Sequence, residues 1–500
     1  MMDMKLKLRT ASRESENQKS DLSRISIGVM LIRGLEPNFS SEVHQQLTEI
    51  TGPAADSDQS IRDLRNLLWC SIDNDDSKDL DQLTVSQEIG GGRVRLWVAI
   101  ADVDALIKKD SAIDLHAAMN TRSVYTSARI FPMLPLQLST NLTSLNPNED
   151  RLALINEMVF SAEGLLESSS LYRAWVRNKV QLAYDAISDW IDGKEALPGQ
   201  AQNIQGMEQQ LRTQDQLAQK LRVLRHQKGS LEFDLFQPRA QFRGEQMMGL
   251  HQQIQNRARQ LIEELMIATN GCTSRFLEQQ NVFSMRRVVR SPERWAKIVE
   301  LALKYGASLP GEPNAQALEI FLAGQHQKDP IRFPDLSLVI VKLMGSGEYI
   351  VENPAKPGVG HFGLAVTDYM HSTAPNRRYP DIVTLRLIKA ALAKEKSPYT
   401  VQELNALALH CTMQEDAAKK VERQMRKSEA AMLLRPRIGE YFEGIVTGIG
   451  DKGTWVRIFE PPAEGRLMGA LPFLEVGAFL KVKLISTHVQ RGFIDFALTH

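Results

Sequence analysis

Between Leu67 and Asp81 the chain reads LLWCSIDNDDSKDLD, an apolar segment that leads directly into a group of carboxylates. The apolar residues predict a buried strand, and the polar residues that follow predict a turn at its end. Five aspartates lie within nine positions, at 73, 75, 76, 79 and 81. Because like charges so close together raise one another's pKa, a neutralising cation is expected. The stretch therefore predicts a strand that carries a metal site.

The oxygen-rich composition of this turn favours magnesium as the cofactor, with manganese as a possible replacement. Hard cations bind carboxylate oxygens and complete their shell with water and substrate phosphate. One or two such ions can activate a water and support a leaving oxygen, which is what phosphodiester hydrolysis requires. We therefore expect a metal-dependent hydrolase.

A calcium-binding loop and a solvated acidic turn are the alternatives to a catalytic metal site. The aspartates alternate with other residues, as the ligands of a helix–loop–helix calcium site do. That pattern requires Gly at its sixth position and Glu at its twelfth, where this chain has Lys78 and Thr84. A catalytic site is thus the favoured interpretation.

Length and composition predict a multidomain protein of the cytoplasm. A chain of 500 residues is too long for one compact core. No apolar run approaches the roughly 20 residues that span a bilayer, and the N-terminus lacks the apolar core of a secretory signal. The three cysteines, Cys70, Cys272 and Cys411, have no zinc-binding spacing and are expected to be buried thiols. With 60 basic and 60 acidic residues, local patches would have to hold any nucleic acid.

The first part of the chain divides at about residue 60. Residues 1–60 predict a small accessory region that is mobile at its start, with a strand over 25–32 and a helix capped by Ser40 or Ser41. Residues 61–395 alternate apolar strands with helical segments, which predicts one large mixed α/β domain. The clearest elements are a strand at Val94–Ile100 and a helix at Arg257–Asn270.

Residues 396–435 predict a long amphipathic helix packed on that domain. There is no Gly or Pro between Thr400 and Leu434, and apolar residues recur at spacings of three and four. Basic residues occupy the outer positions and follow the helix: Lys419, Lys420, Arg423, Arg426, Lys427, Arg435 and Arg437. They indicate either a solvated face or a contact with an RNA backbone, and both interpretations stay open.

Residues 436–500 predict a small all-β barrel. Four short β-type segments are separated by Gly, Pro and Asp clusters. They are Tyr441–Val446, Thr454–Phe459, Phe479–Leu484 and Gly492–Ala497. A terminal barrel of this size suits a binding module.

Four segments resemble, in the expected order, the motifs of the ribonuclease II (RNB-domain) family of 3′-to-5′ exoribonucleases. They are Ile72–Asp81, Phe131–Pro135, Ile262–Met266 and His371–Asp381. The resemblance implies an α+β (mixed α/β) catalytic RNB domain, with a channel that admits only single-stranded RNA, and a C-terminal OB-fold barrel. It further implies hydrolysis from the 3′ end with release of nucleoside 5′-monophosphates.

The resemblance also implies roles for individual residues around the acidic stretch. Asp73, Asp79 and Asp81 would bind the metal, and Asp79 and Asp81 would be catalytic together with Arg377. Arg377 would hold the scissile phosphate, because its planar, permanently charged fork suits developing negative charge. Arg378, beside it, would contact RNA.

Three further residues are implied to contact the terminal nucleotides. Tyr125 matches a tyrosine that stacks on the last base, and Phe233 matches an aromatic on its opposite side. Glu263 matches a carboxylate that contacts the sugar of the terminal nucleotide. Recognition of the 2′-hydroxyl distinguishes RNA from DNA.

The sequence departs from the family pattern at two places. Gln82 follows Asp81 where the family has a further Asp, so metal affinity is expected to fall. The paired N-terminal cold-shock-like domains are expected to be absent, because about 60 residues cannot hold both. A catalytically weak RNA-binding protein of the same fold is therefore the alternative to an active enzyme. We expect a monomer, and the sequence indicates no protein partner.

Overall fold

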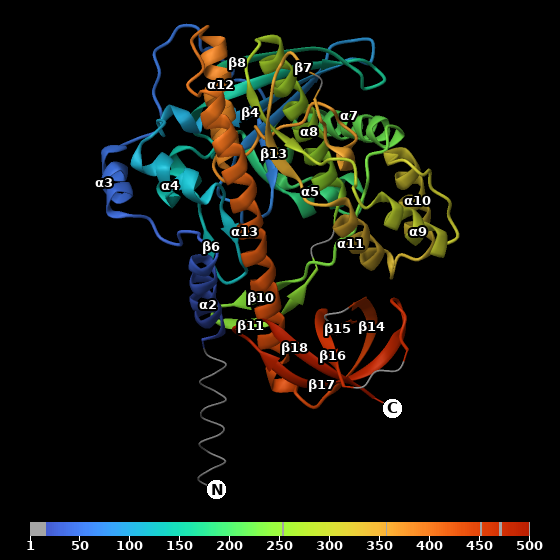
Figure 1. Ribbon diagram of the computed structural model, residues 1–500. Coiled ribbons are helices and arrows are strands. Elements are labelled where there is room, and N and C mark those ends of the chain that lie inside the picture. The colour runs from blue at the N-terminus through green and yellow to red at the C-terminus, as the bar shows by residue number, and fades with distance from the viewer. Residues whose placement is uncertain (1–16, 253–254, 357, 451–452, 470–472, 500) are drawn as a thin grey trace.

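The computed structural model describes residues 17–252, 255–356, 358–450, 453–469 and 473–499. Among these, seven strands form a mixed sheet in the order β1-β8-β7-β4-β3-β2-β9 (Figure 1). They are β1 (Arg62–Asp63), β2 (Cys70–Asp73), β3 (Gln82–Glu88), β4 (Val94–Ala101), β7 (Asp150–Phe160), β8 (Leu166–Arg177) and β9 (Val180–Ala183). The pairs β1·β8 and β2·β9 are parallel and the others are antiparallel. The mixed α/β fold is confirmed.

The core of the domain lies on this sheet. Strand β4 is buried along almost its whole length, as expected of a central strand covered on both faces. Helices α7 (Met207–Gln227) and α8 (Arg257–Gln279) pack on the strands, and α12 (Tyr379–Leu392) packs on α8. The predicted strand and helix are both confirmed, although α8 continues beyond Asn270.

The remaining helices and hairpins surround this core. The helices are α3 (Ser41–Glu49), α4 (Ala112–Asn120), α5 (Tyr184–Ile191), α6 (Gly199–Gln202), α9 (Trp295–Lys304), α10 (Ala315–Lys328) and α11 (Phe333–Met344). Two hairpins are formed by β5 (Val124–Tyr125) with β6 (Ile130–Phe131) and by β10 (Arg239–Arg243) with β11 (Gln246–His251). Strands β12 (Ser284–Val288) and β13 (Glu348–Glu352), which α9, α10 and α11 separate in the sequence, form a further antiparallel pair. None of the helices in the described ranges is long and apolar enough to cross a membrane.

A single long helix, α13 (Val401–Leu434), joins the two ends of the molecule (Figure 1). Its first turn is fixed by a capping box between Thr400 and Glu403, which satisfies two otherwise unpaired backbone amides. Leu404 and Cys411 belong to the core on the sheet, whereas Val421 packs in a second core with the barrel. The predicted amphipathic helix is confirmed, and it spans both cores.

Five strands at the C-terminal end close into a barrel in the order β14-β15-β16-β18-β17. They are β14 (Tyr441–Gly450), β15 (Gly453–Ile458), β16 (Ala463–Met468), β17 (Phe479–His488) and β18 (Phe493–Leu498). The predicted OB-fold barrel is confirmed. Strand β16 was not predicted from its sequence, AEGRLM, because a Gly and few β-branched residues give it a weak strand pattern.

The predicted strand over residues 25–32 is wrong, because these residues form the end of helix α2 (Gln18–Ile32). The β-branched residues favour a strand locally, but Leu22, Val29 and Met30 lie on one helical face and are buried with the residues of α13. The helix after Ser40 is confirmed, and Ser40 caps it by accepting from the backbone N of Val43. The segment expected to be mobile lies at residues 1–16, outside the described residues.

Candidate active site

The acidic stretch forms a tight turn between β2 and β3. Asp73 ends β2, and its Oδ1 accepts hydrogen bonds from the backbone N of Asn74 and from Ser77 Oγ, at 2.8 and 3.0 Å. These bonds fix the first residues of the turn. Asp81, directly before β3, is 1% exposed. The predicted strand and turn are therefore present, with the strand at Cys70–Asp73 rather than over the apolar residues before it.

The buried carboxylate of Asp81 is paired with Arg377, whose side chain is 41% exposed. Its Oδ2 accepts from Arg377 Nε at 2.9 Å, and its Oδ1 accepts from the backbone N of Asn376 at 2.8 Å. Both donors precede α12, on the segment 371–381. Burial raises the pKa of Asp81 to about 7. The charge of Arg377 acts to lower this pKa, and the charge of Asp79 acts to raise it. Burial alone would lower the pKa of Arg377, but the negative charges of Asp81, Asp73 and Asp79 raise it, so its guanidinium stays charged.

Tyr125 joins this group from the β5–β6 hairpin. Its hydroxyl donates to Asp79 Oδ2 at 3.0 Å, and burial raises its pKa, so the hydroxyl keeps its proton. The backbone N of Tyr125 donates to Glu422 Oε1 of α13 at 3.3 Å, and Arg122 donates to the same oxygen. Glu422 was not identified from the sequence. It holds the hairpin that carries Tyr125 against α13.

The carboxylate oxygens of the turn are the type of ligand that a hard divalent cation prefers. Among the described residues, no hydrogen bond reaches Asp73 Oδ2 or Asp79 Oδ1, so each side chain keeps an oxygen available. The same residues contain no group of three His, Cys, Asp or Glu side chains close enough to hold an ion as they stand. Arg377 supplies the compensating positive charge instead.

The two other aspartates of the stretch lie apart from this group. Asp75 and Asp76 are exposed. Asp75 lines a separate cavity with Lys179 and Gln181. Neither side chain is placed to replace a carboxylate of the turn.

Gln82 is buried at the start of β3, opposite Ile100. Its side chain forms no hydrogen bond to the described carboxylates, Asp81 included, so it is not part of the network around Arg377. A buried amide therefore stands at the position where the resemblance implies a fourth acidic residue.

Arg378 lines a cavity of 230 Å³ beside Tyr125 and Arg377. One of its guanidinium nitrogens donates to Asp381 Oδ1 at 2.7 Å, and Asp381 is fully buried. Asp381 also accepts from the backbone N of Ala374. Arg378 therefore holds the loop before α12 in place, next to the predicted phosphate position.

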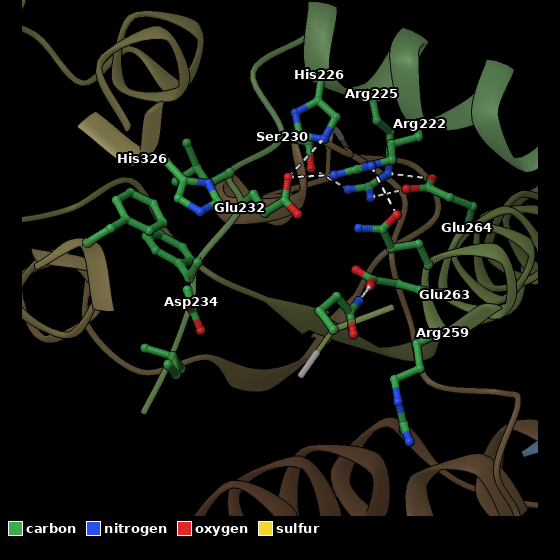
Figure 2. Close-up of a pocket in the computed structure, with 16 residues that line it drawn as sticks. Arg222, Arg225, His226, Ser230, Glu232, Asp234, Arg259, Glu263, Glu264 and His326 are labelled. Carbon is green, nitrogen blue, oxygen red and sulfur yellow. Dashed lines mark hydrogen bonds and ion pairs between the residues drawn. The ribbon is translucent and has the colours of Figure 1, made fainter. Parts of the chain in front are cut away.

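Phe233 and Glu263 lie in a different cavity, of 680 Å³, shown in Figure 2. Glu263 accepts from Gln255 Nε2 at 3.0 Å, and Phe233 packs against the small core of α9, α10 and α11. The structure brings Tyr125 to Asp79 but does not bring Phe233 to the same cavity. Their expected positions on two sides of one base stay a prediction.

Arg259 connects this larger cavity to the acidic turn. It lines the cavity (Figure 2). It also donates to Asn74 Oδ1 at 2.9 Å and lies over the ring of Tyr184, 4.4 Å from the ring centre. Sequence reasoning missed Arg259 and Tyr184. The available signal was spacing, since Arg259 precedes Glu263 by four residues and so shares its helical face.

Comparisons with known proteins match both parts of the chain. The RNB domain profile matches residues 61–394, and that of the RNase II-type exonuclease C-terminal S1 domain matches residues 440–499. Ribonuclease R of Vibrio cholerae is 29% identical over 92% of this chain and 60% of its own length. The chain thus spans well under two thirds of that relative.

Two solved structures share the fold. RNase R of Mycoplasma genitalium, in its apo form, is 22% identical and has a TM-score of 0.85 over 95% of this chain and 77% of its own. Yeast Ssd1, described as a pseudonuclease, is 15% identical and has a TM-score of 0.72 over 92% of this chain and 57% of its own. A nuclease and a pseudonuclease therefore share this architecture, and the site residues must distinguish them.

Proposed function

Because the chain belongs to the RNB domain family, we propose that it is a metal-dependent exoribonuclease that degrades single-stranded RNA from its 3′ end and releases nucleoside 5′-monophosphates. The observation that carries the proposal is the ion pair between the buried Asp81 and the half-exposed Arg377, next to the available oxygens of Asp73 and Asp79. A fold retained only for binding would not need a buried carboxylate with a raised pKa beside two further acids.

Magnesium is the cofactor that this donor set supports best, with manganese as the substitute. Asp73, Asp79 and Asp81 would hold it, and when bound it would activate a water and stabilise charge on the phosphate. Arg377 would donate to the non-bridging oxygens of the scissile phosphate as their negative charge grows. Its present contact with Asp81 keeps the guanidinium charged and oriented before RNA arrives.

The remaining predicted residues would place the 3′-terminal nucleotides. Tyr125 would present its ring to a base, and stacking of that kind contributes about 1–3 kcal/mol without sequence preference. Phe233 would stack from the larger cavity, and Glu263 would accept from a ribose hydroxyl. Arg378 would keep the loop before α12, and with it Arg377, at a fixed distance from the turn. The expected cytoplasmic location and monomeric state remain predictions.

The test is incubation of 5′-labelled single-stranded RNA with the purified protein in magnesium or manganese. Products that shorten one nucleotide at a time from the 3′ end would support the enzyme, and EDTA should stop the shortening. Binding without shortening in either metal would instead favour the catalytically weak RNA-binding protein. RNA with a 3′-phosphate is a suitable control, since a blocked end should slow the first step.

A further inference from the structure

A second charged site lies where the barrel meets α11 and α13. It is a cavity of 230 Å³, here called the junction cavity. Its charged lining residues are Arg423, Arg426 and Lys427 of α13, Arg457 of β15, Asp335 of α11 and Glu464 of β16. The charged lining therefore comes from four elements, of which α11 lies farthest from the others in the sequence.

The cations from α13 are not neutralised by the protein. Arg423, Arg426 and Lys427 share one helical face, since they are three and four residues apart. They form no hydrogen bond or ion pair with the described residues. Burial, together with Arg239 and Arg423, lowers the pKa of Arg426, although Glu422 and Glu429 oppose this effect. Positive charge is thus concentrated at this point of the helix.

Arg457 adds a buried guanidinium from the barrel. The residue is 7% exposed, one nitrogen donates to Asp335 Oδ2 at 2.9 Å, and the group lies 4.6 Å from the ring of Phe236. Its Nε is buried without a partner. A buried donor left unpaired is unfavourable, and an acceptor inside the cavity would give it a partner.

The acidic residues of the cavity cannot balance these charges. Asp335 is occupied by Arg457, and Glu464 accepts from Thr447 Oγ1 at 2.9 Å. Two carboxylates therefore face four cations among the described lining residues. The excess suits an anion with several acceptor oxygens, and guanidinium groups match the geometry of phosphate.

We propose that the junction cavity binds backbone phosphate of the single-stranded RNA substrate, upstream of the nucleotides at the acidic turn. This inference rests on the proposed function for the identity of the ligand. The sequence left two interpretations of the basic face of α13, a solvated surface or an RNA contact. This proposal selects the RNA contact for Arg423, Arg426 and Lys427. Because phosphate contacts carry no base information, the site holds RNA of any sequence.

The proposal is tested by equilibrium binding of 5′-labelled oligoadenylate in EDTA, where no cleavage can occur. The double variant Arg423→Gln/Arg426→Gln should bind about tenfold more weakly than wild type. Its affinity should also depend less on salt, with the log–log slope reduced by about 1.4, as expected for two lost phosphate contacts. Arg423→Gln alone should lose less RNA affinity than the double variant. Because Arg423 is exposed, this single variant still tests the proposal if the double variant does not fold.

Lys420→Gln is the matched control, because Lys420 is an exposed cation on the same helix that does not line the cavity. It should leave both affinity and slope unchanged. Equal losses in Lys420→Gln and the double variant, or no loss in the latter, would overturn the proposal.

Competition with ADP and with inorganic phosphate distinguishes binding of the RNA backbone from binding of a free nucleotide or free phosphate. Millimolar ADP or phosphate should displace little RNA, since each offers few contacts. Tight ADP binding that the double variant abolishes would overturn the RNA assignment in favour of a free nucleotide. Because binding is measured without metal, a protein that binds as predicted but never cleaves would refute the proposed function alone.

Discussion

The acidic turn and the junction cavity hold charge of opposite sign, and the protein neutralises them to different degrees. In the turn, both oxygens of Asp81 already accept hydrogen bonds, one of them from Arg377. In the cavity, Arg423 and Arg426 have no partner among the described residues. An oriented guanidinium held by a buried carboxylate can stabilise the charge that develops on a reacting phosphate, whereas an unbalanced cationic cavity attracts an anion over a distance. Under the proposed function, the first region would account for turnover and the second for affinity.

The largest effect is expected from Asp81→Asn. The amide is nearly isosteric but removes the charge that holds Arg377 and a metal, so single-turnover cleavage should fall at least about a thousandfold. RNA affinity should change by less than about threefold, because the turn contributes little to holding the strand. Filter binding and quenched-flow cleavage on the same preparation measure both quantities. A variant that lost affinity and rate together would remove the distinction between the two regions.

A smaller effect is expected from Arg377→Lys, which keeps the charge but loses the planar fork. Cleavage at saturating RNA should fall about a hundredfold, since one oriented donor set on the phosphate is lost. Arg294→Lys, at an exposed position before α9, is the matched control and should behave as wild type. A loss confined to the apparent affinity would mean that Arg377 holds RNA rather than assists its cleavage.

At the junction cavity, Asp335→Asn should lower stability rather than turnover. The substitution leaves Arg457 buried without its acidic partner and should cost about 2 kcal/mol in the free energy of unfolding. Chemical denaturation monitored by tryptophan fluorescence and by far-UV circular dichroism measures the change. Wild-type stability in this variant would show that the pair does not help to hold the barrel on α11.

The smallest effect is expected from Gln82→Asp, which restores the acidic residue of the family pattern. Added negative charge beside Asp81 should lower the magnesium concentration for half-maximal rate by about threefold. The maximal rate should stay within about twofold, because Gln82 makes no hydrogen bond to the described carboxylates. A large rise in the maximal rate would mean that the natural Gln82 limits catalysis. Titration of the initial rate with magnesium measures both quantities.

Local patterns in the sequence predicted the strand and turn around Asp73, the helix α13 and the barrel, because each has a strong period or charge pattern. They failed at α2, where burial against α13 overrides β-branched residues. They also failed at Arg259 and Arg457, whose partners Asn74 and Asp335 lie far away in the chain. Such contacts arise only when the elements pack, and no local pattern encodes them.

The two regions also differ in how far the resemblance to a known family helps to identify their residues. Arg377 was identified because it belongs to a motif, and the structure places it on Asp81. The junction cavity combines residues of α11, α13 and the barrel, none of which forms a motif with the others. Its charge imbalance is visible only in three dimensions.

The most direct test of the central claim uses RNA that carries a radioactive phosphate only at its last internucleotide linkage. With magnesium, the first turnover should release the label as a nucleoside 5′-monophosphate, identified by chromatography, before any shorter internal fragment forms. Asp81→Asn should release none while it still binds the RNA. Label that first appears in fragments of several nucleotides, or that is never released in magnesium or manganese, would contradict the account.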